Sequence, residues 1–330
     1  MTMRDIGNEE TEKLIADMEK KIRREYAQAE KELNEKFNEY VRKFKIKDEI
    51  KKQQLARGEI TQEFYDYWRK GQFSVAFRWQ EMRRTMADDL TTVSQKARSI
   101  VDGYRGEAYA INHDYITFLI EKDSGIDTSY TLYNTRSAER LLKGDEVLPR
   151  PGKRMNGKIG RGEVVEWQEG RIQSVTLQSL LQGESTEHMA QRICRTLSVS
   201  SYADAVRYAR TAMTGAQNGG RFDAISRCRD EGIDVVGQWS ATLDGRTRHT
   251  HRQIDGEVAE PGEMFSNGCR FPGDPNGPPA EIWRCRCRLN ERVRGYTKDP
   301  SDLTRRNTDH MEEETYEEWK NAKAKKGAKK

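Results

Sequence analysis

The stretch from Glu9 to Phe44 contains neither proline nor glycine, and its apolar residues recur at helical spacing. These apolar positions are Leu14, Met18, Ile22, Tyr26, Ala29, Leu33, Phe37, Val41 and Phe44. A narrow apolar stripe, with Lys, Arg and Glu on the other faces, is typical of a long helix that packs along one seam. Asn8 is a suitable N-cap residue for this helix. The chain is therefore expected to be built on long helices.

A second long helix is predicted from Phe73 to Val101, with its end at Gly103 and Gly106. Between the two long helices, Thr61 can cap a short helix that ends at Gly71. The second long helix is expected to lie antiparallel to the first. Two arrangements remain open, an intramolecular helical hairpin and a coiled coil with a partner chain.

Composition agrees with solvated helices rather than a large core, because 34% of the residues are charged and only 35% are hydrophobic. A net charge of +4 is too small to indicate nucleic-acid binding by itself. The chain has no long apolar run and begins with an acidic, polar segment, so neither a membrane span nor a signal peptide is expected. Five cysteines, an odd number, favour a reduced compartment such as the cytoplasm.

The middle of the chain is expected to contain a helix to Lys122, a short strand or turn over 128–133, and a short helix over 135–143. Residues 148–162 combine proline, glycine and basic side chains, which predicts a linker between domains. Beyond it the sequence predicts three helices: one ends at Gly183, the next opens at Ser185, and the third is capped by Ser200 or Ser201. The third helix should end near Gly232.

Two short strands are predicted, over 235–243 and 282–289, with a loop rich in glycine and proline between them. In the second strand Cys285, Cys287 and Leu289 should share one face, because side chains alternate along a strand. Helices that precede such a β unit favour an α+β fold that is mostly α. We therefore expect long antiparallel N-terminal helices, followed by a C-terminal domain of helices packed on a small loop-rich β unit.

The cysteines and histidines of this β unit allow three interpretations. Thiolate and imidazole groups suit a structural Zn²⁺ site, which would draw on Cys285, Cys287 and His251, with either Cys269 or His249. Alternatively, the cysteines are small buried apolar residues and the histidines are polar loop residues. A catalytic metal centre that uses Asp244, His249 and His251 is the third interpretation. The Cys-x-Cys spacing differs from the usual zinc chelate, so the choice stays open.

The segments ARTAMTGAQNGGR, QWSATLDGRTRHTHRQIDG, FPGDP and CRC follow one another in this order. Together they resemble the phage Mu F-like minor head protein family, also called phage head morphogenesis proteins. The matching positions are Arg210, Thr211, Asn218, Gly220, Trp239, Asp244, Arg246, Thr247, His251, Asp255, Gly256, Cys285 and Cys287. The resemblance covers residues 202–293. Some family members carry a second cysteine pair where this chain has Arg248, His249 and Thr250, which weakens the transfer of any metal site.

The resemblance implies a structural protein of a tailed phage or prophage, made in the host cytoplasm and located inside the phage head of the virion. It also implies binding to the portal protein and to capsid or scaffold proteins, and a role in head morphogenesis and in DNA packaging or ejection. No enzymatic activity and no catalytic residue are expected. Some members are fused to toxin or ADP-ribosyltransferase domains, for which residues 294–330 are expected to be too short.

On this interpretation the chain has four parts. Residues 1–147 form a helical docking region, 148–162 the linker, 163–295 the Mu F-like α+β domain, and 296–330 a charged, disordered tail. The residues of the resemblance are expected to have structural roles, with Asp244, Arg246 and Asp255 ordering loops. Arg210 could donate to a buried carboxylate such as Asp244.

The tail ends in a lysine-rich segment that is expected either to be a solvated end or to contact double-stranded DNA without sequence preference. The lysines are Lys320, Lys323, Lys325, Lys326, Lys329 and Lys330. Two alternative functions remain. One is a metal-dependent nuclease or hydrolase centred on His249 and His251, and the other is a zinc-stapled DNA-binding module.

Overall fold

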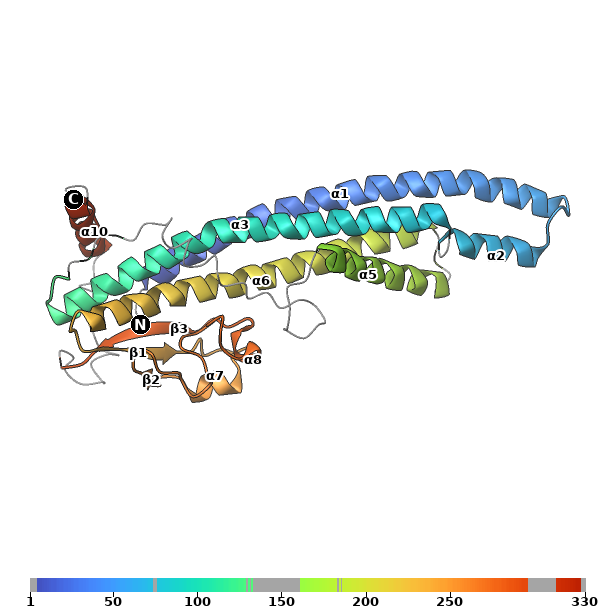
Figure 1. Ribbon diagram of the computed structural model, residues 1–330. Coiled ribbons are helices and arrows are strands. Elements are labelled where there is room, and N and C mark those ends of the chain that lie inside the picture. The colour runs from blue at the N-terminus through green and yellow to red at the C-terminus, as the bar shows by residue number, and fades with distance from the viewer. Residues whose placement is uncertain are drawn as a thin grey trace. The chain divides into compact units, whose positions relative to one another are not determined.

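The computed structural model describes residues 5–73, 76–128, 130, 132, 161–182, 184, 186–295 and 313–327. Its helices are α1 (Ile6–Ala56), α2 (Gln62–Gln72), α3 (Phe77–Ser124), α5 (Arg161–Leu181), α6 (Thr186–Asp230), α7 (His249–Gln253), α8 (Pro279–Ile282) and α10 (Glu313–Gly327). Its strands are β1 (Val235–Ser240), β2 (Val258–Ala259) and β3 (Arg288–Val293), as Figure 1 shows. The predicted fold class, α+β and mostly α, is confirmed.

Contacts divide the chain into two compact units. The sheet unit draws its described residues from 1–19, 100–149 and 207–330, and the helical unit from 20–99 and 150–206. Each of α1, α3 and α6 contributes one stretch to each unit. Most of the predicted linker 148–162 lies outside the described residues, and its last two residues open α5.

Helix α1 is longer at both ends than the sequence indicated. Asp5, rather than Asn8, caps it: the Asp5 carboxylate accepts the backbone N–H of Asn8 at 2.9 Å. At the other end α1 continues past Phe44, because Asp48 is buried and accepts a hydrogen bond of 2.8 Å from Tyr65 on α2. The predicted N-cap of α2 is confirmed, since the Thr61 side chain accepts from the N–H of Phe64.

Helix α3 passes through Gly103 and Gly106, which the sequence analysis placed at its end. Each glycine costs a helix about 1 kcal/mol, but the buried apolar face that continues from Ala108 to Ile120 outweighs this cost. The antiparallel arrangement of α1 and α3 is confirmed within each unit. Asn112 contacts Gly7 in the sheet unit, and Asp89 pairs with Lys36 in the helical unit.

Helix α6 is a single helix, where the sequence analysis predicted two that met at Ser200 or Ser201. Ser201 is buried inside this continuous helix. The predicted end near Gly232 is confirmed. Gly232 has a φ of +93°, and the N–H of Ile233 returns to the carbonyl of Cys228, as in a Schellman motif.

The sheet has the order β2-β1-β3, and both pairings are antiparallel. Trp239 of β1 lies opposite Leu289 of β3. The predicted second strand was wrong in its bounds, because residues 279–282 form α8 and the ladder begins only at Arg288. The alternation was right: Cys285, Cys287 and Leu289 are all buried. The short strand β2 was not predicted.

In the sheet unit, α6 lies between the sheet on one side and α3 on the other (Figure 1). The core of this unit includes Trp239, which is fully buried, and aromatic residues of α3. The core of the helical unit is separate and includes Phe37, Trp79 and Ile172. No described helix has the length and apolar character needed to cross a membrane.

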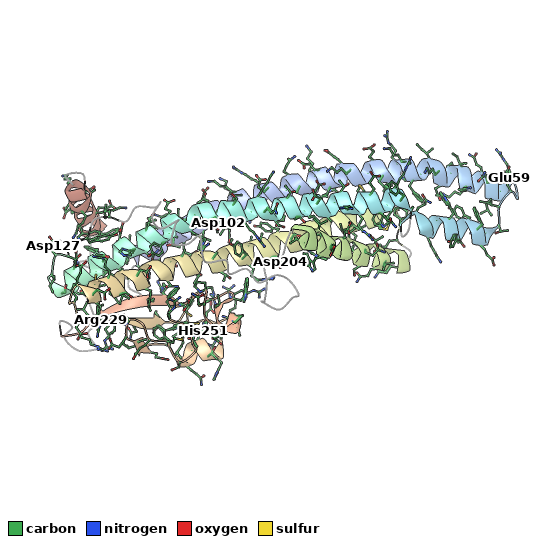
Figure 2. All side chains as sticks on the ribbon, in the orientation of Figure 1. Glu59, Asp102, Asp127, Asp204, Arg229 and His251 are labelled. Atoms are coloured by element: carbon green, nitrogen blue, oxygen red, sulfur yellow. The ribbon has the colours of Figure 1, made fainter. Side chains whose placement is uncertain are left out.

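Residues 313–327, which were expected to lie in a disordered tail, form α10 and pack on the sheet unit. Tyr316 contacts aromatic rings of α3, and Trp319 donates a 2.6 Å hydrogen bond to Glu121. Lys323 is buried between Glu121 and Asp127, at 2.7 and 2.8 Å. Asp127 is labelled in Figure 2, just beyond the end of α3.

Candidate functional site

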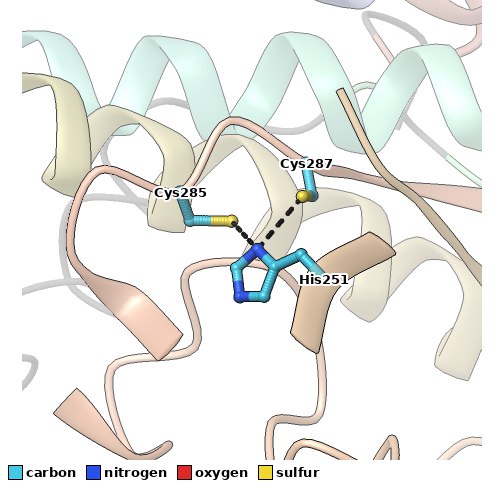
Figure 3. Close-up of side chains that lie close together, drawn as sticks. All are labelled: His251, Cys285 and Cys287. Atoms are coloured by element: carbon cyan, nitrogen blue, oxygen red, sulfur yellow. Dashed lines mark hydrogen bonds between the residues drawn. The ribbon is translucent and has the colours of Figure 1, made fainter. Parts of the chain in front are cut away.

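A cluster of one imidazole and two thiols lies inside the sheet unit (Figure 3). His251 comes from α7, and Cys285 and Cys287 come from the segment between α8 and β3. Their candidate ligand atoms all lie within 4.8 Å of one another. His251 Nδ1 is 3.3 Å from the sulfur of Cys287 and 3.8 Å from that of Cys285. Each of the three residues is at most 3% exposed.

The backbone before the cysteines turns sharply. Arg284 has a φ of 56°, and it is the one residue other than glycine with a positive φ in the described chain. This left-handed conformation is rare for a residue with a side chain, so the surrounding structure must hold it. The N–H of Arg284 donates to Thr211 of α6 at 3.3 Å, and the N–H of Cys285 donates to the carbonyl of Ile282 at 3.1 Å.

Helix α6 fixes the two cysteine carbonyls. Thr214 donates to the carbonyl of Cys285 at 3.1 Å, and Asn218 donates to that of Cys287 at 3.1 Å. Asn218 also donates to the carbonyl of Pro272 and accepts the N–H of Leu289. The Asn218 amide is fully buried and bonds to three segments: the cysteine segment, the loop before α8 and the start of β3. It therefore fixes their positions relative to one another.

The other ring nitrogen of His251 faces a carboxylate. Nε2 has no aligned hydrogen-bond partner among the described residues, but it lies 2.8 Å from Glu281 Oε2. Thr250 donates to the same oxygen at 2.9 Å. An ionised carboxylate can only accept, so the Nε2 position favours the tautomer with its proton on Nε2. That tautomer directs the Nδ1 lone pair toward the two sulfur atoms.

The pKa values of the two thiols are shifted in opposite directions. The hydrogen bond from Cys285, together with the contact with His251, lowers the pKa of Cys287 below its usual value. The same contact with Cys287, together with burial, raises the pKa of Cys285 well above its usual value. Of the two sulfur atoms, that of Cys287 is therefore the more readily deprotonated.

Two kinds of chemistry use such a group. Two sulfurs and an imidazole nitrogen that converge are a ligand set for a soft or borderline metal ion. A thiolate beside an imidazole that is oriented by a carboxylate is also the arrangement of a cysteine nucleophile and its base. The burial of all three residues closes the two sulfur atoms to a substrate, so the geometry favours a structural role.

The other predicted ligands lie apart from this cluster. Cys269 is fully buried, with a pKa raised to about 12 by burial, but it is not among the three clustered residues. His249 is exposed at the start of α7. The predicted catalytic centre is also not assembled, because the Asp244 carboxylate accepts two hydrogen bonds from Arg286, at 2.5 and 2.7 Å.

The loops of the β unit are held by residues that the sequence analysis named. Asp244 also accepts the N–H of Arg246, whereas the Arg246 side chain is 82% exposed and lies 3.9 Å from Asp244. Thr247 donates to the carbonyl of Thr242. Asp255 accepts the N–H of Ala241 at 2.8 Å, and Gly256 turns with a φ of +83°.

Arg210 does not pair with Asp244 as predicted. It forms an ion pair of 2.6 Å with Glu19, because both residues lie where α6 passes α1 within the sheet unit. Gly220 lies where α6 meets α3: a Cβ atom there would be 2.2 Å from the carbonyl oxygen of Tyr109. Only glycine permits this approach of the two helices.

The match to known proteins falls on this region. Residues 170–290 match the family described as Phage Mu protein F like protein. This region belongs to the Mu F-like family. The resemblance predicted from the sequence is thereby confirmed, and we call residues 170–290 the Mu F-like module. No solved structure is significantly similar to the chain.

Two named relatives also match. Minor head protein GP7 of Bacillus phage SPP1 is 27% identical over 48% of this chain and 54% of its own length. NAD(+)--arginine ADP-ribosyltransferase EFV of Enterococcus faecalis is 25% identical over 71% of this chain and 48% of its own length. An uncharacterised protein of Haemophilus influenzae is 25% identical over 59% of this chain and 39% of its own length. The chain thus spans about half the length, or less, of these relatives.

Two important residues around the Mu F-like module were missed by sequence reasoning. Glu281 faces His251, and nothing in its local sequence marks it as different from other loop carboxylates. Arg221 is 1% exposed and forms two hydrogen bonds of 2.7 Å with the Asp5 carboxylate. A signal for Arg221 existed, since it directly follows Gly220 on a helix face that had to be buried.

The tail lysines proposed for DNA binding have different surroundings. Lys323 is buried and paired with the Glu121 carboxylate, so its ammonium group is not accessible to a phosphate. Lys320 lies over the ring of Tyr316, and Lys325 is exposed. The side chains of Lys326, Lys329 and Lys330 lie outside the described residues.

Proposed function

We propose that this chain is a non-enzymatic minor head protein of a tailed phage or prophage that acts in head morphogenesis. The match of residues 170–290 to the Phage Mu protein F like family carries the proposal. The similarity to the minor head protein of Bacillus phage SPP1 supports it. On this proposal the protein is part of the virion and contacts capsid or scaffold proteins.

The site geometry supports a structural rather than a catalytic module. Polar residues of α6 hold the cysteine segment through buried hydrogen bonds, and the sulfur of Cys287 is closed to substrates. We carry no transferase activity over from the Enterococcus faecalis relative, because the alignment spans 48% of that protein. The proposed role of the Mu F-like module is to present a binding surface during assembly.

The finer part of the proposal is that the long N-terminal helices dock on the portal protein. Helices α1 and α3 form an antiparallel pair with charged outer faces, which suits a polar docking surface. A few copies bound near the portal would also be placed to influence DNA packaging or ejection. The accessible tail lysines would then add weak contacts to packaged DNA.

Sedimentation of procapsids tests both the role in the head and the docking on the portal protein. The tagged chain is added to an assembly mixture, and procapsids are separated from free protein on a gradient. The proposal expects the chain in the procapsid fraction, and it expects loss of the chain from procapsids assembled without portal protein. Association that persists without portal protein would contradict portal docking but keep the head role. A chain that stays at the top of both gradients would contradict the whole proposal.

A further inference from the structure

We propose that His251 Nδ1, Cys285 Sγ and Cys287 Sγ bind one Zn²⁺ ion, and that Glu281 positions the histidine for it. Zn²⁺ prefers thiolate and imidazole ligands in tetrahedral geometry. The three ligand atoms already lie within 4.8 Å of one another, a spacing that a single ion can bridge with small side-chain movements. This inference does not depend on the role of the chain in a phage head.

The outer contacts of the ligands argue for a metal more strongly than the cluster alone. Histidines that bind zinc commonly donate their other N–H to a carboxylate, which fixes the tautomer and raises the basicity of the ligand nitrogen. Glu281 lies 2.8 Å from Nε2 of His251, and Thr250 holds the same carboxylate oxygen. Glu281 thus lies where the outer partner of a zinc-bound histidine is found.

The backbone of the cysteine segment is also preset. The left-handed Arg284 turns the chain so that Cys285 and Cys287 both face His251. Thr214 and Asn218 on α6 hold the carbonyls of the two cysteines, and Thr242 donates to the carbonyl of Arg286 between them at 2.7 Å. Holding a rare backbone conformation costs free energy, which a bound metal would offset.

Charge favours the same conclusion. Two thiolates and a neutral imidazole balance the charge of Zn²⁺, so the filled site would be neutral inside the core. On one side the buried Trp239 ring packs edge-on against His251, with centroids 5.2 Å apart. The fourth tetrahedral position would be taken by something other than a histidine, cysteine or acidic side chain of the described residues, such as water.

The ion would be structural. It would join α7 to the segment before β3 across 34 and 36 residues of chain, the separations of His251 from Cys285 and Cys287. Between β1 and β3 the chain has only short regular elements, α7, β2 and α8, so such a link would hold the two sides of the β unit together. Removal of the ion should therefore loosen the β unit more than the long helices.

Metal content of the reduced 330-residue chain tests the site. We expect about one Zn²⁺ per chain in the wild type, and a loss of most of it in Cys287→Ser and in Cys285→Ser. Cys269→Ser is the matched control, because Cys269 is equally buried but lies outside the cluster. Co²⁺ added to the metal-free chain should give the thiolate charge-transfer and intense d–d bands of a tetrahedral site.

Metal that is absent from the wild type and does not bind on titration would overturn the proposal. So would metal that is retained in the Cys285→Ser/Cys287→Ser double variant, or lost equally in Cys269→Ser. Circular dichroism of each variant shows whether the helices have formed. If the cysteine variants do not fold, the wild type alone tests the proposal. Its metal is removed with a chelator, and Zn²⁺ added back to the folded protein must raise the melting temperature.

The Glu281→Gln variant tests whether Glu281 positions His251 for the metal or only packs beside it. We expect Zn²⁺ affinity, measured by competition with a chromogenic chelator, to fall by about 10–100-fold. The melting temperature of the metal-free protein should change little, because Glu281 makes its contacts through an imidazole and a hydroxyl at the rim of the unit. Unchanged affinity with a lowered melting temperature would remove Glu281 from the proposed site.

Discussion

The contact between α6 and α3 at Gly220 gives a sharp prediction about stability. A methyl group added there would lie 2.2 Å from the carbonyl oxygen of Tyr109, 3.0 Å from its carbonyl carbon and 3.2 Å from the N–H nitrogen of His113. These are backbone atoms of a helix, so relief requires the two helices to move apart. Gly220→Ala should therefore destabilise the protein although alanine is the better helix former.

The magnitude follows from two opposing effects. Overpacking of a tight contact costs about 1–3 kcal/mol or more, and the higher helix propensity of alanine returns about 1 kcal/mol. At a backbone overlap of this size the upper end applies, which leaves a net loss of about 2 kcal/mol.

Gly219→Ala is the matched control. It lies one residue earlier on α6 and beside a cavity of about 270 Å³, and its added methyl would meet Phe271 and Tyr109 at an ordinary 3.8 Å. We expect this variant to gain up to about 1 kcal/mol, because only the propensity difference remains. Urea unfolding of the wild type and both variants measures the free energies. If Gly220→Ala is as stable as Gly219→Ala, the close helix contact does not exist as described.

Three further predictions concern buried charges. Arg221→Met leaves the Asp5 carboxylate without its main partner, so urea unfolding at neutral pH should show a loss of about 3 kcal/mol. Burial raises the pKa of Asp5, but the charge and hydrogen bonds of Arg221 bring it below the ordinary 3.8. The contribution of Asp5 is thus present above that value and lost as pH falls below it, and Asp5→Asn should flatten the acid limb of the stability curve; an unchanged limb would exclude Asp5 as its cause. Lys323→Ala should make α10 sensitive to limited proteolysis, whereas the exposed Lys325→Ala should not; equal digestion of both would contradict the anchoring role of Lys323.

The periodicity of apolar residues predicted most of the fold, because their spacing along a helix or strand indicates which face is buried. The stripe of α1 proved correct from Met18 to Phe44, although Ile15 rather than Leu14 is buried before it. The alternation of Cys285, Cys287 and Leu289 also proved correct. Local breaking signals were less reliable. Gly103 and Ser201 lie inside continuous helices, since the apolar faces on either side stay in register and their burial exceeds the local cost.

The candidate site was only partly predictable for a related reason. The sequence pointed to His251 with the two cysteines, but it could not separate them from His249 and Cys269. The loops decide which of these side chains come together, and loop residues show no repeating pattern in the sequence. Glu281 becomes distinct only when α8 brings it to the imidazole. Residues whose role depends on contacts across the fold leave little trace in a local pattern.

The proposal that the chain is a structural part of a phage head is tested most directly by quantitative mass spectrometry of purified heads. Heads are purified from the phage or prophage that encodes the chain, and its peptides are measured against those of the major capsid protein. We expect the chain in the heads at a small, reproducible fraction of the capsid protein, resistant to washing with high salt. A chain that is expressed in the infected cells but absent from purified heads would contradict the account.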